Sequence, residues 1–208
     1  MKAWLDRLRR RKESRSLARR AIPEALWTLT LARLPFIQRL PTVDLAELRR
    51  LASLFLDSKE FTGAGGLEVT DEMAVCIAVQ ACLPVPRFGL KPYDAFVGIV
   101  VHPDEVVARR SHTDEDGVVH EYDEVLSGEA MDGGPIMLSW HDVSEAGASA
   151  DWGYNVVVHE FAHVLDMADG AADGVPALPS IEARETWLGV LLPEYEAQIG
   201  RASCRERV

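Results

Sequence analysis

The sequence predicts an α+β protein, mainly helical with a small mixed sheet. Apolar residues recur every three or four positions over several long segments, which is the pattern of helices with one buried face. Shorter runs rich in β-branched and aromatic residues, at 95–102 and 136–140, are typical of buried strands. The chain has 208 residues, of which 48% are hydrophobic and 26% charged, and this suits one compact domain with a real core.

Capping residues and prolines mark where the helices begin and end. Pro23 stands at the first turn of the first helix, where proline is tolerated, and Asp44 caps the second. Thr70 or Asp71 begins a third helix, and its nearly continuous apolar residues predict that it is buried. The helices are expected at residues 23–33, from 44 onward, at 70–83, at 142–146, at 155–168 and at 180–199.

The strands are fewer and shorter than the helices. Besides the two buried runs, residues 59–62 are expected to form a short strand. Residues 109–124 are polar and acidic, and they predict an excursion from the domain that contains a hairpin. Together these segments make only a small sheet.

Charge is unevenly distributed along the chain. The formal net charge is -11, but residues 1–20 contain nine Lys or Arg against Asp6 and Glu13, a balance of +7, so the remainder carries -18. An acidic body argues against a nucleic-acid-binding surface. We expect residues 1–20 to be a solvated, partly helical basic arm, and contact with anionic lipid or RNA is the alternative.

Composition also predicts a compartment. No apolar segment follows the basic start before Leu26, so no secretory signal is indicated, and no apolar run approaches the roughly 18 residues of a membrane span. The chain has three cysteines, and Cys76 and Cys82 lie in an apolar stretch, as buried thiols do in a reducing compartment. We therefore expect a cytoplasmic protein without a membrane span.

One five-residue pattern carries chemistry. His159, Glu160 and His163 form H-E-x-x-H within the helix expected at 155–168. Positions i and i+4 of a helix lie on one face, one turn apart, so two imidazoles placed there can bind a single Zn²⁺. Glu160 stands beside them, where a carboxylate can take the proton of an attacking water. The pattern predicts the metal-binding helix of a zinc peptidase.

The residues around the pattern support this interpretation. The other face of the helix is apolar, with Val157 and Phe161 among its members, and it predicts a packing face. Asn155 is a candidate N-cap, and Gly170 is a candidate stop. Asp166 follows His163 by three residues, so it could accept a hydrogen bond from a ligand imidazole.

These residues and three upstream stretches resemble one family. The helix sequence runs from Val157 to Asp166 and is followed by the segment 169–176, and the upstream stretches are 69–82, 125–130 and 134–140. In this order they are similar to the Mlc titration factor A family of glucose-regulated zinc metallopeptidases, over about residues 23–199. The resemblance implies a zincin-like fold with the motif on a central helix, one catalytic Zn²⁺, and aminopeptidase-like activity on short peptides. The family's named member also binds a transcriptional repressor of sugar uptake.

The resemblance also shows what the chain lacks. In the family the third zinc ligand is a glutamate on a later helix, beyond the position of Val208, with a tyrosine a little before it. Residues 200–208 match nothing expected there. We therefore divide the chain into the basic arm 1–20, a zincin-like peptidase domain 21–199 that is incomplete at its C-terminus, and a non-native or disordered tail 200–208.

Four other residues are candidates for the third ligand. Glu182 and Glu185 follow His163 by 19 and 22 positions, a distance at which some other zinc peptidases carry this glutamate, but both are expected on a solvated helix face. His141 and Asp173 are weaker candidates. The strand 136–140 also has two interpretations. It is either an edge strand that binds substrate backbone by strand addition or an ordinary strand of the sheet.

The sequence thus predicts a zinc-dependent peptidase that hydrolyses peptide bonds with a metal-activated water. His159 and His163 are the predicted metal ligands, and Glu160 is the predicted general base. Two alternatives remain open. One is a non-catalytic protein that sequesters a repressor, and the other is an inactive fragment that lacks the third zinc ligand.

Overall fold

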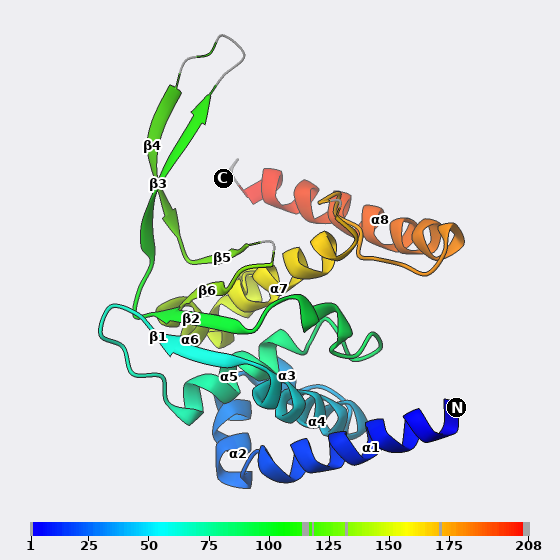
Figure 1. The fold of residues 1–208 in the computed structure, drawn as a ribbon. Helices are drawn as coiled ribbons and strands as arrows, with labels where there is room; N and C mark the ends of the chain where they lie inside the picture. The colour runs from blue at the N-terminus through cyan, green and yellow to red at the C-terminus, as the bar shows by residue number, and fades with distance from the viewer. Residues whose placement is uncertain (1, 114–116, 118, 132, 171, 206–208) are drawn as a thin grey trace. The chain divides into compact units, whose positions relative to one another are not determined.

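The computed structural model describes residues 2–113, 117, 119–131, 133–170 and 172–205 (Figure 1). The chain divides into two compact units, residues 1–162 and residues 163–208. The helices are α1 (Lys2–Arg19), α2 (Glu24–Arg33), α3 (Pro35–Gln38), α4 (Thr42–Ser58), α5 (Asp71–Ala81), α6 (Trp140–Ser149), α7 (Val156–Asp166) and α8 (Ile181–Arg205). The strands are β1 (Glu60–Gly63), β2 (Gly98–His102), β3 (Val106–Thr113), β4 (Val119–Leu126), β5 (Gly128–Ala130) and β6 (Ile136–Ser139). This confirms the predicted α+β class.

The four-stranded sheet is mixed. Its strand order is β1-β2-β6-β5, with β1, β2 and β6 parallel and β5 antiparallel to β6. All four residues of β6 are buried, and this strand has a neighbour on each side. The strand 136–140 is therefore an ordinary internal strand, and its interpretation as an edge strand was wrong. The edge beside β6 belongs to β5, in which Gly128 pairs with Leu138.

Strands β3 and β4 form the hairpin predicted from the polar segment. They pair antiparallel from Val106↔Leu126 to Thr113↔Val119, and Figure 1 shows this hairpin standing clear of the four-stranded sheet. The Arg110 side chain binds Glu124 of β4 at 3.0 Å and also forms an ion pair with Glu129 of β5. This arginine therefore ties the hairpin to the edge strand that follows it.

The core of the first unit contains a cluster of aromatic residues. Phe55 of α4 and Tyr93 of the 3-10 helix Lys91–Ala95 are buried, and their ring centroids lie 6.1 Å apart in edge contact. The Lys59 amine donates hydrogen bonds to the carbonyls of Tyr93 and Phe96 and lies 3.9 Å from the Phe96 ring centroid. Burial lowers the pKa of Lys59 to about 8. Its hydrogen bonds hold the segment that leads into β2.

Helix α5 is buried, as its apolar composition predicts. Thr70 caps it by accepting a hydrogen bond from the Met73 amide at 3.3 Å. Cys76 and Cys82 are buried free thiols, and burial raises the pKa of Cys76 to about 11. Neither thiol has the lowered pKa of a nucleophile.

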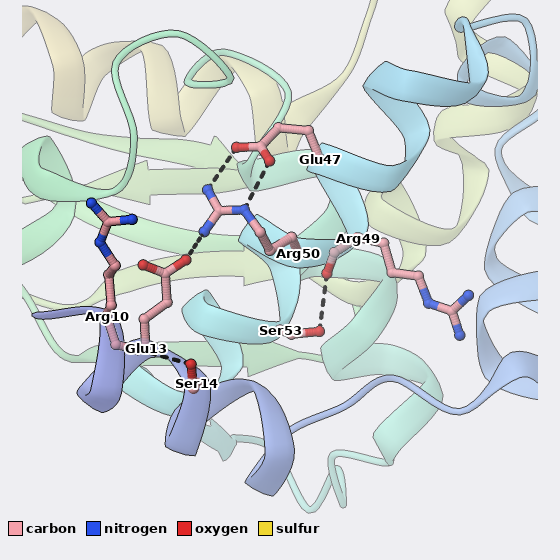
Figure 2. A network of polar contacts seen from close by, with 7 residues as sticks. All are labelled: Arg10, Glu13, Ser14, Glu47, Arg49, Arg50 and Ser53. Atoms are coloured by element: carbon pink, nitrogen blue, oxygen red, sulfur yellow. Dashed lines mark hydrogen bonds and ion pairs between the residues drawn. The ribbon is translucent and has the colours of Figure 1, made fainter. Parts of the chain in front are cut away.

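The basic segment 1–20 is largely helical and is tied to α4. Figure 2 shows Arg50 of α4 lying between two carboxylates, Glu13 of α1 and Glu47 of its own helix. Farther along, Arg19 makes two hydrogen bonds of 2.7 Å to Asp57. One positive charge of α1, that of Arg19, is therefore paired with an acid of α4, whereas Glu13 pairs an acid of α1 with an arginine of α4.

Several predicted boundaries were wrong by a few residues. The helix predicted from residue 44 onward is α4, which begins at Thr42. The helix predicted at 70–83 is α5, which ends at Ala81. Strand β2 starts at Gly98, because the 3-10 helix with Pro92 in its first turn takes up residues 91–95. Trp140 opens α6 instead of ending a strand, since Ser139 caps that helix by accepting a hydrogen bond from the Asp142 amide.

The second unit consists of the end of α7, a loop and α8. Asp166 holds the loop by accepting hydrogen bonds from the amides of Asp173 (3.2 Å) and Gly174 (2.7 Å). Asp173 in turn binds Arg184 of α8 at 2.8 Å. Helix α8 continues to Arg205, so it extends past residue 199, and the three-part division at 20 and 199 stays a prediction.

Within the part of the chain that the structure describes, no helix is both long enough and apolar enough to cross a membrane.

Candidate metal-binding helix

The start of α7 is fixed by the residue before it. The Asn155 side-chain oxygen accepts a hydrogen bond from the Val158 amide at 2.8 Å, and its carbonyl accepts one from the His159 amide at 3.0 Å. Asn155 is therefore the N-cap, as predicted. The helix ends near Gly170, whose φ of +88° follows a short 3-10 turn and suits a residue without a side chain.

The three residues of the motif differ in exposure. His159 and His163 are exposed positions of α7, and helical spacing puts them on one face, one turn apart. Glu160 is only 5% exposed. Exposed imidazoles are accessible to an ion from solvent, whereas the carboxylate between them is enclosed by the protein.

The opposite face of α7 packs into the aromatic core. Phe161 is fully buried, and its ring lies 5.0 Å from that of Tyr93, 5.6 Å from Phe55 and 5.9 Å from Phe96, measured between centroids. Edge-on and tilted contacts at these distances are favourable for aromatic rings. Phe161 thus fixes the rotation of the helix about its axis, so that Glu160, one position earlier, has a defined place in the first unit.

Glu160 lies against the edge strand at a glycine. A Cβ atom added to Gly128 would lie 2.7 Å from both Cγ and Oε1 of Glu160, and 2.8 Å from Cγ2 of Val156. Only a residue without a side chain lets β5 come so close to the carboxylate. Residues 125–130 were singled out by the family resemblance, but nothing in the sequence predicted this contact.

The described residues include two predicted metal ligands rather than a complete set. Throughout residues 2–113, 117, 119–131, 133–170 and 172–205, no group of three or more His, Cys, Asp or Glu side chains is gathered so that it could hold a metal ion. A catalytic zinc usually has three protein ligands and an open position. Two imidazoles one turn apart would supply two of those three protein ligands.

The structure describes each of the four other candidates for the third ligand. His141 is exposed in the first turn of α6. Asp173 is paired with Arg184, which lowers the pKa of its carboxyl. Glu182 and Glu185 are exposed on α8, as expected for a solvated helix face.

The family of the chain follows from its whole length. The model of the glucose-regulated metallo-peptidase M90 family matches residues 7–207. The chain belongs to this family of metallopeptidases, which implies a metal ion. The resemblance found in the motif and in the upstream stretches is thereby confirmed.

Curated relatives agree with this assignment. An uncharacterized protein of Synechocystis (slr2042) is 34% identical over 194 residues, which are 93% of this chain and 69% of that protein. Mlc titration factor A of Klebsiella pneumoniae strain 342 is 35% identical over 157 residues, which are 75% of this chain and 58% of that protein. The protein of the same name from Salmonella arizonae is 34% identical over 155 residues, or 74% and 61%. The matches thus span about three fifths of the titration factors.

Proposed function

We propose that the chain carries the metal-binding helix of a zinc-dependent peptidase with a zincin-like fold. The observation that carries the proposal is α7 itself. Two exposed histidines stand one turn apart, and an enclosed glutamate lies between them against an edge strand. His159 and His163 would hold the ion through neutral ring nitrogens. The third ligand is proposed to come from a later helix, as the family resemblance implies.

The metal and Glu160 have different roles in the proposed hydrolysis. When bound, zinc acts as a Lewis acid that polarises a carbonyl and makes water a nucleophile near neutral pH. Glu160 takes the proton of the attacking water and passes it to the departing amine. Enclosure of Glu160 keeps bulk water from its carboxylate and holds it in one place against Gly128. The products are a carboxylic acid and an amine, with no redox change.

Strand β5 offers a place for the substrate. It lies at the end of the strand order β1-β2-β6-β5, and Glu160 contacts it at Gly128. An extended peptide that pairs with the outer edge of β5 would pass beside the proposed general base. We therefore propose a peptide substrate bound by strand addition, with cleavage near a peptide N-terminus as the aminopeptidase-like assignment implies.

The Glu160→Gln substitution tests the catalytic role. It keeps the size of the side chain and removes the group that accepts the proton, so we expect peptide hydrolysis to fall by roughly 10²–10⁴-fold. Zinc content should stay that of the parent protein, because the two histidines are unchanged. Hydrolysis of a fluorogenic peptide measures the first, and metal analysis measures the second. Unchanged hydrolysis in Glu160→Gln would exclude Glu160 as the base.

A second function is supported by the name of the relatives. Several of them are called Mlc titration factor A, so binding of a transcriptional repressor is proposed for this chain as well. The same Glu160→Gln variant separates the two functions. A protein that acts only by sequestering a repressor would keep its effect on repressor activity in Glu160→Gln, whereas an effect that depends on hydrolysis would be lost.

A further inference from the structure

A buried glutamine lies behind the N-terminus of α7. Gln80 is fully buried on α5, and the other buried residues of this helix are apolar. Its amide nitrogen donates hydrogen bonds to the carbonyl of Cys76 at 3.2 Å and to the Cys76 sulfur at 3.4 Å. Its amide oxygen accepts one from Nδ2 of Asn155 at 2.8 Å. A buried polar group is costly, and a methionine would fill the same space without that cost.

The direction of this hydrogen-bond chain is fixed from one end. The Cys76 carbonyl can only accept, so the nitrogen of Gln80 must face it and the oxygen of Gln80 must face Asn155. Asn155 then has to turn its own nitrogen toward Gln80, which leaves its oxygen for the Val158 amide. The cap of α7 is therefore set by the backbone of α5, through two side-chain amides.

The cap bears directly on the motif. The carbonyl of Asn155 accepts the hydrogen bond of the His159 amide, so the first predicted ligand stands one turn after the residue that Gln80 orients. We propose that Gln80 is a positioning residue of the metal-binding helix. It orients Asn155 so that the first turn of α7 is closed, and this fixes the backbone from which His159 projects. The inference rests on the proposed metal site.

The test uses the full chain with the substitution Gln80→Met, which conserves volume and removes both ends of the amide. We expect faster hydrogen exchange of the Val158 and His159 amides. We also expect Zn²⁺ affinity to fall roughly tenfold, as is typical when the support of a metal ligand is lost. Competition with a chromophoric chelator measures the affinity. If Gln80→Met does not fold, Asn155→Ala serves in its place, because it removes both bonds from a half-buried position.

Thr70→Ala is the matched control. It removes the cap of α5, a single hydrogen bond from the Met73 amide, and should lower the unfolding temperature without changing exchange in α7 or Zn²⁺ affinity. A purely structural role of Gln80 would make the two variants behave alike. Unchanged exchange and affinity in Gln80→Met would overturn the inference.

A double variant gives a second check. An aspartate at position 155 caps α7 with either oxygen, but its carboxylate would face the Gln80 oxygen. Asn155→Asp alone should therefore weaken Zn²⁺ binding, and Gln80→Met in the Asn155→Asp background should restore part of it. Additive losses would contradict the proposal. If the parent chain binds no Zn²⁺, the proposed function fails, while the exchange measurement still decides whether Gln80 orders the first turn.

Discussion

At Gly128 a missing side chain decides where the proposed general base lies. The space for a Cβ atom is taken by Glu160 and Val156, and the nearest atoms belong to side chains rather than to backbone. Gly128→Ala should therefore displace the Glu160 carboxylate while changing the backbone little. We expect a stability loss of about 1–3 kcal/mol from overpacking. We expect hydrolysis to fall roughly 10²-fold, because a displacement of about 1 Å at a reacting group can cost that much.

Chemical denaturation measures the loss of stability in Gly128→Ala, and peptidase assays measure its loss of hydrolysis. Zinc content should not change in Gly128→Ala, since the three atoms nearest to the added methyl group belong to Glu160 and Val156 and not to either histidine. Full activity in a folded Gly128→Ala protein would show that β5 does not confine Glu160.

At the candidate site, some residues could be predicted from the sequence and others could not. Spacing alone predicted His159, Glu160 and His163, because the helical repeat fixes which residues share a face. Asn155 was predicted as the cap because asparagine before an apolar helix is a local signal. Gly128 and Gln80 were not predicted, since their contacts join segments 32 and 75 positions apart in the chain. Such contacts leave no periodic pattern in the sequence.

At the scale of elements, α6 is held against the α2–α3 junction by a close approach at Gly147. A Cβ atom there would lie 2.1 Å from the Arg33 carbonyl oxygen and 3.2 Å from Cδ of Pro35. Alanine is favoured over glycine inside a helix by about 1 kcal/mol, but the obstacle here is backbone. We expect Gly147→Ala to destabilise the protein by about 1–3 kcal/mol or more, measured by urea unfolding.

Gly189 of α8 is the control for this prediction. It has no atom within 4 Å of its would-be Cβ among the described residues, and its φ lies outside the left-handed region. Gly189→Ala should therefore be neutral or stabilising by up to about 1 kcal/mol. Equal effects of the two substitutions would mean that helix propensity, and not the contact with Arg33, determines the result.

Elements were predicted better than their pairing. Helices α2, α4, α5 and α7 and the hairpin β3–β4 follow from caps, prolines and periodicity. The strand order cannot be predicted in this way, because a short apolar run such as Ile136–Ser139 has the same pattern in an internal strand and in an edge strand. Residues 128–130 were not predicted as a strand, since three residues carry too little periodicity. The sequence therefore left two interpretations of the run Ile136–Ser139 open, and the strand order shows that it is internal.

At the scale of the whole molecule, charge pairing makes stability depend on acid. Hydrogen bonds from Arg19 and Ser16 lower the pKa of Asp57 from its usual 3.8 to about 2. The folded form thus favours the ionised carboxylate, so this contribution is present above about pH 4 and is lost as the pH falls toward 2. Because Arg19 is largely exposed, solvent screens the pair, and its contribution is about 0.2–1 kcal/mol.

Asp57→Asn should remove that contribution. The free energy of unfolding near pH 7 is expected to fall by about 0.2–1 kcal/mol, and its decline between pH 4 and pH 2 should become shallower. Denaturant titrations at a series of pH values measure both. An unchanged slope in Asp57→Asn would show that the α1–α4 ion pair does not contribute to acid sensitivity.

The charges that make up the net charge of -11 also form ion pairs between α1 and α4. The uneven distribution predicted a separate basic arm, and α1 does carry that charge, but Asp57 of α4 pairs with Arg19 of α1, and Arg50 of α4 pairs with Glu13 of α1. Composition could locate the charge in the chain. It could not show which residues of α4 pair with α1, because those pairs join residues 37 and 38 positions apart.

The most direct test of the account is the metal stoichiometry of the purified chain after dialysis against Zn²⁺, measured by inductively coupled plasma mass spectrometry. We predict equal zinc uptake in the parent and in Glu160→Gln, and loss of that zinc in the double variant His159→Ala and His163→Ala. Equal zinc content in the parent and in the double histidine variant would contradict the assignment of α7 as the metal-binding helix.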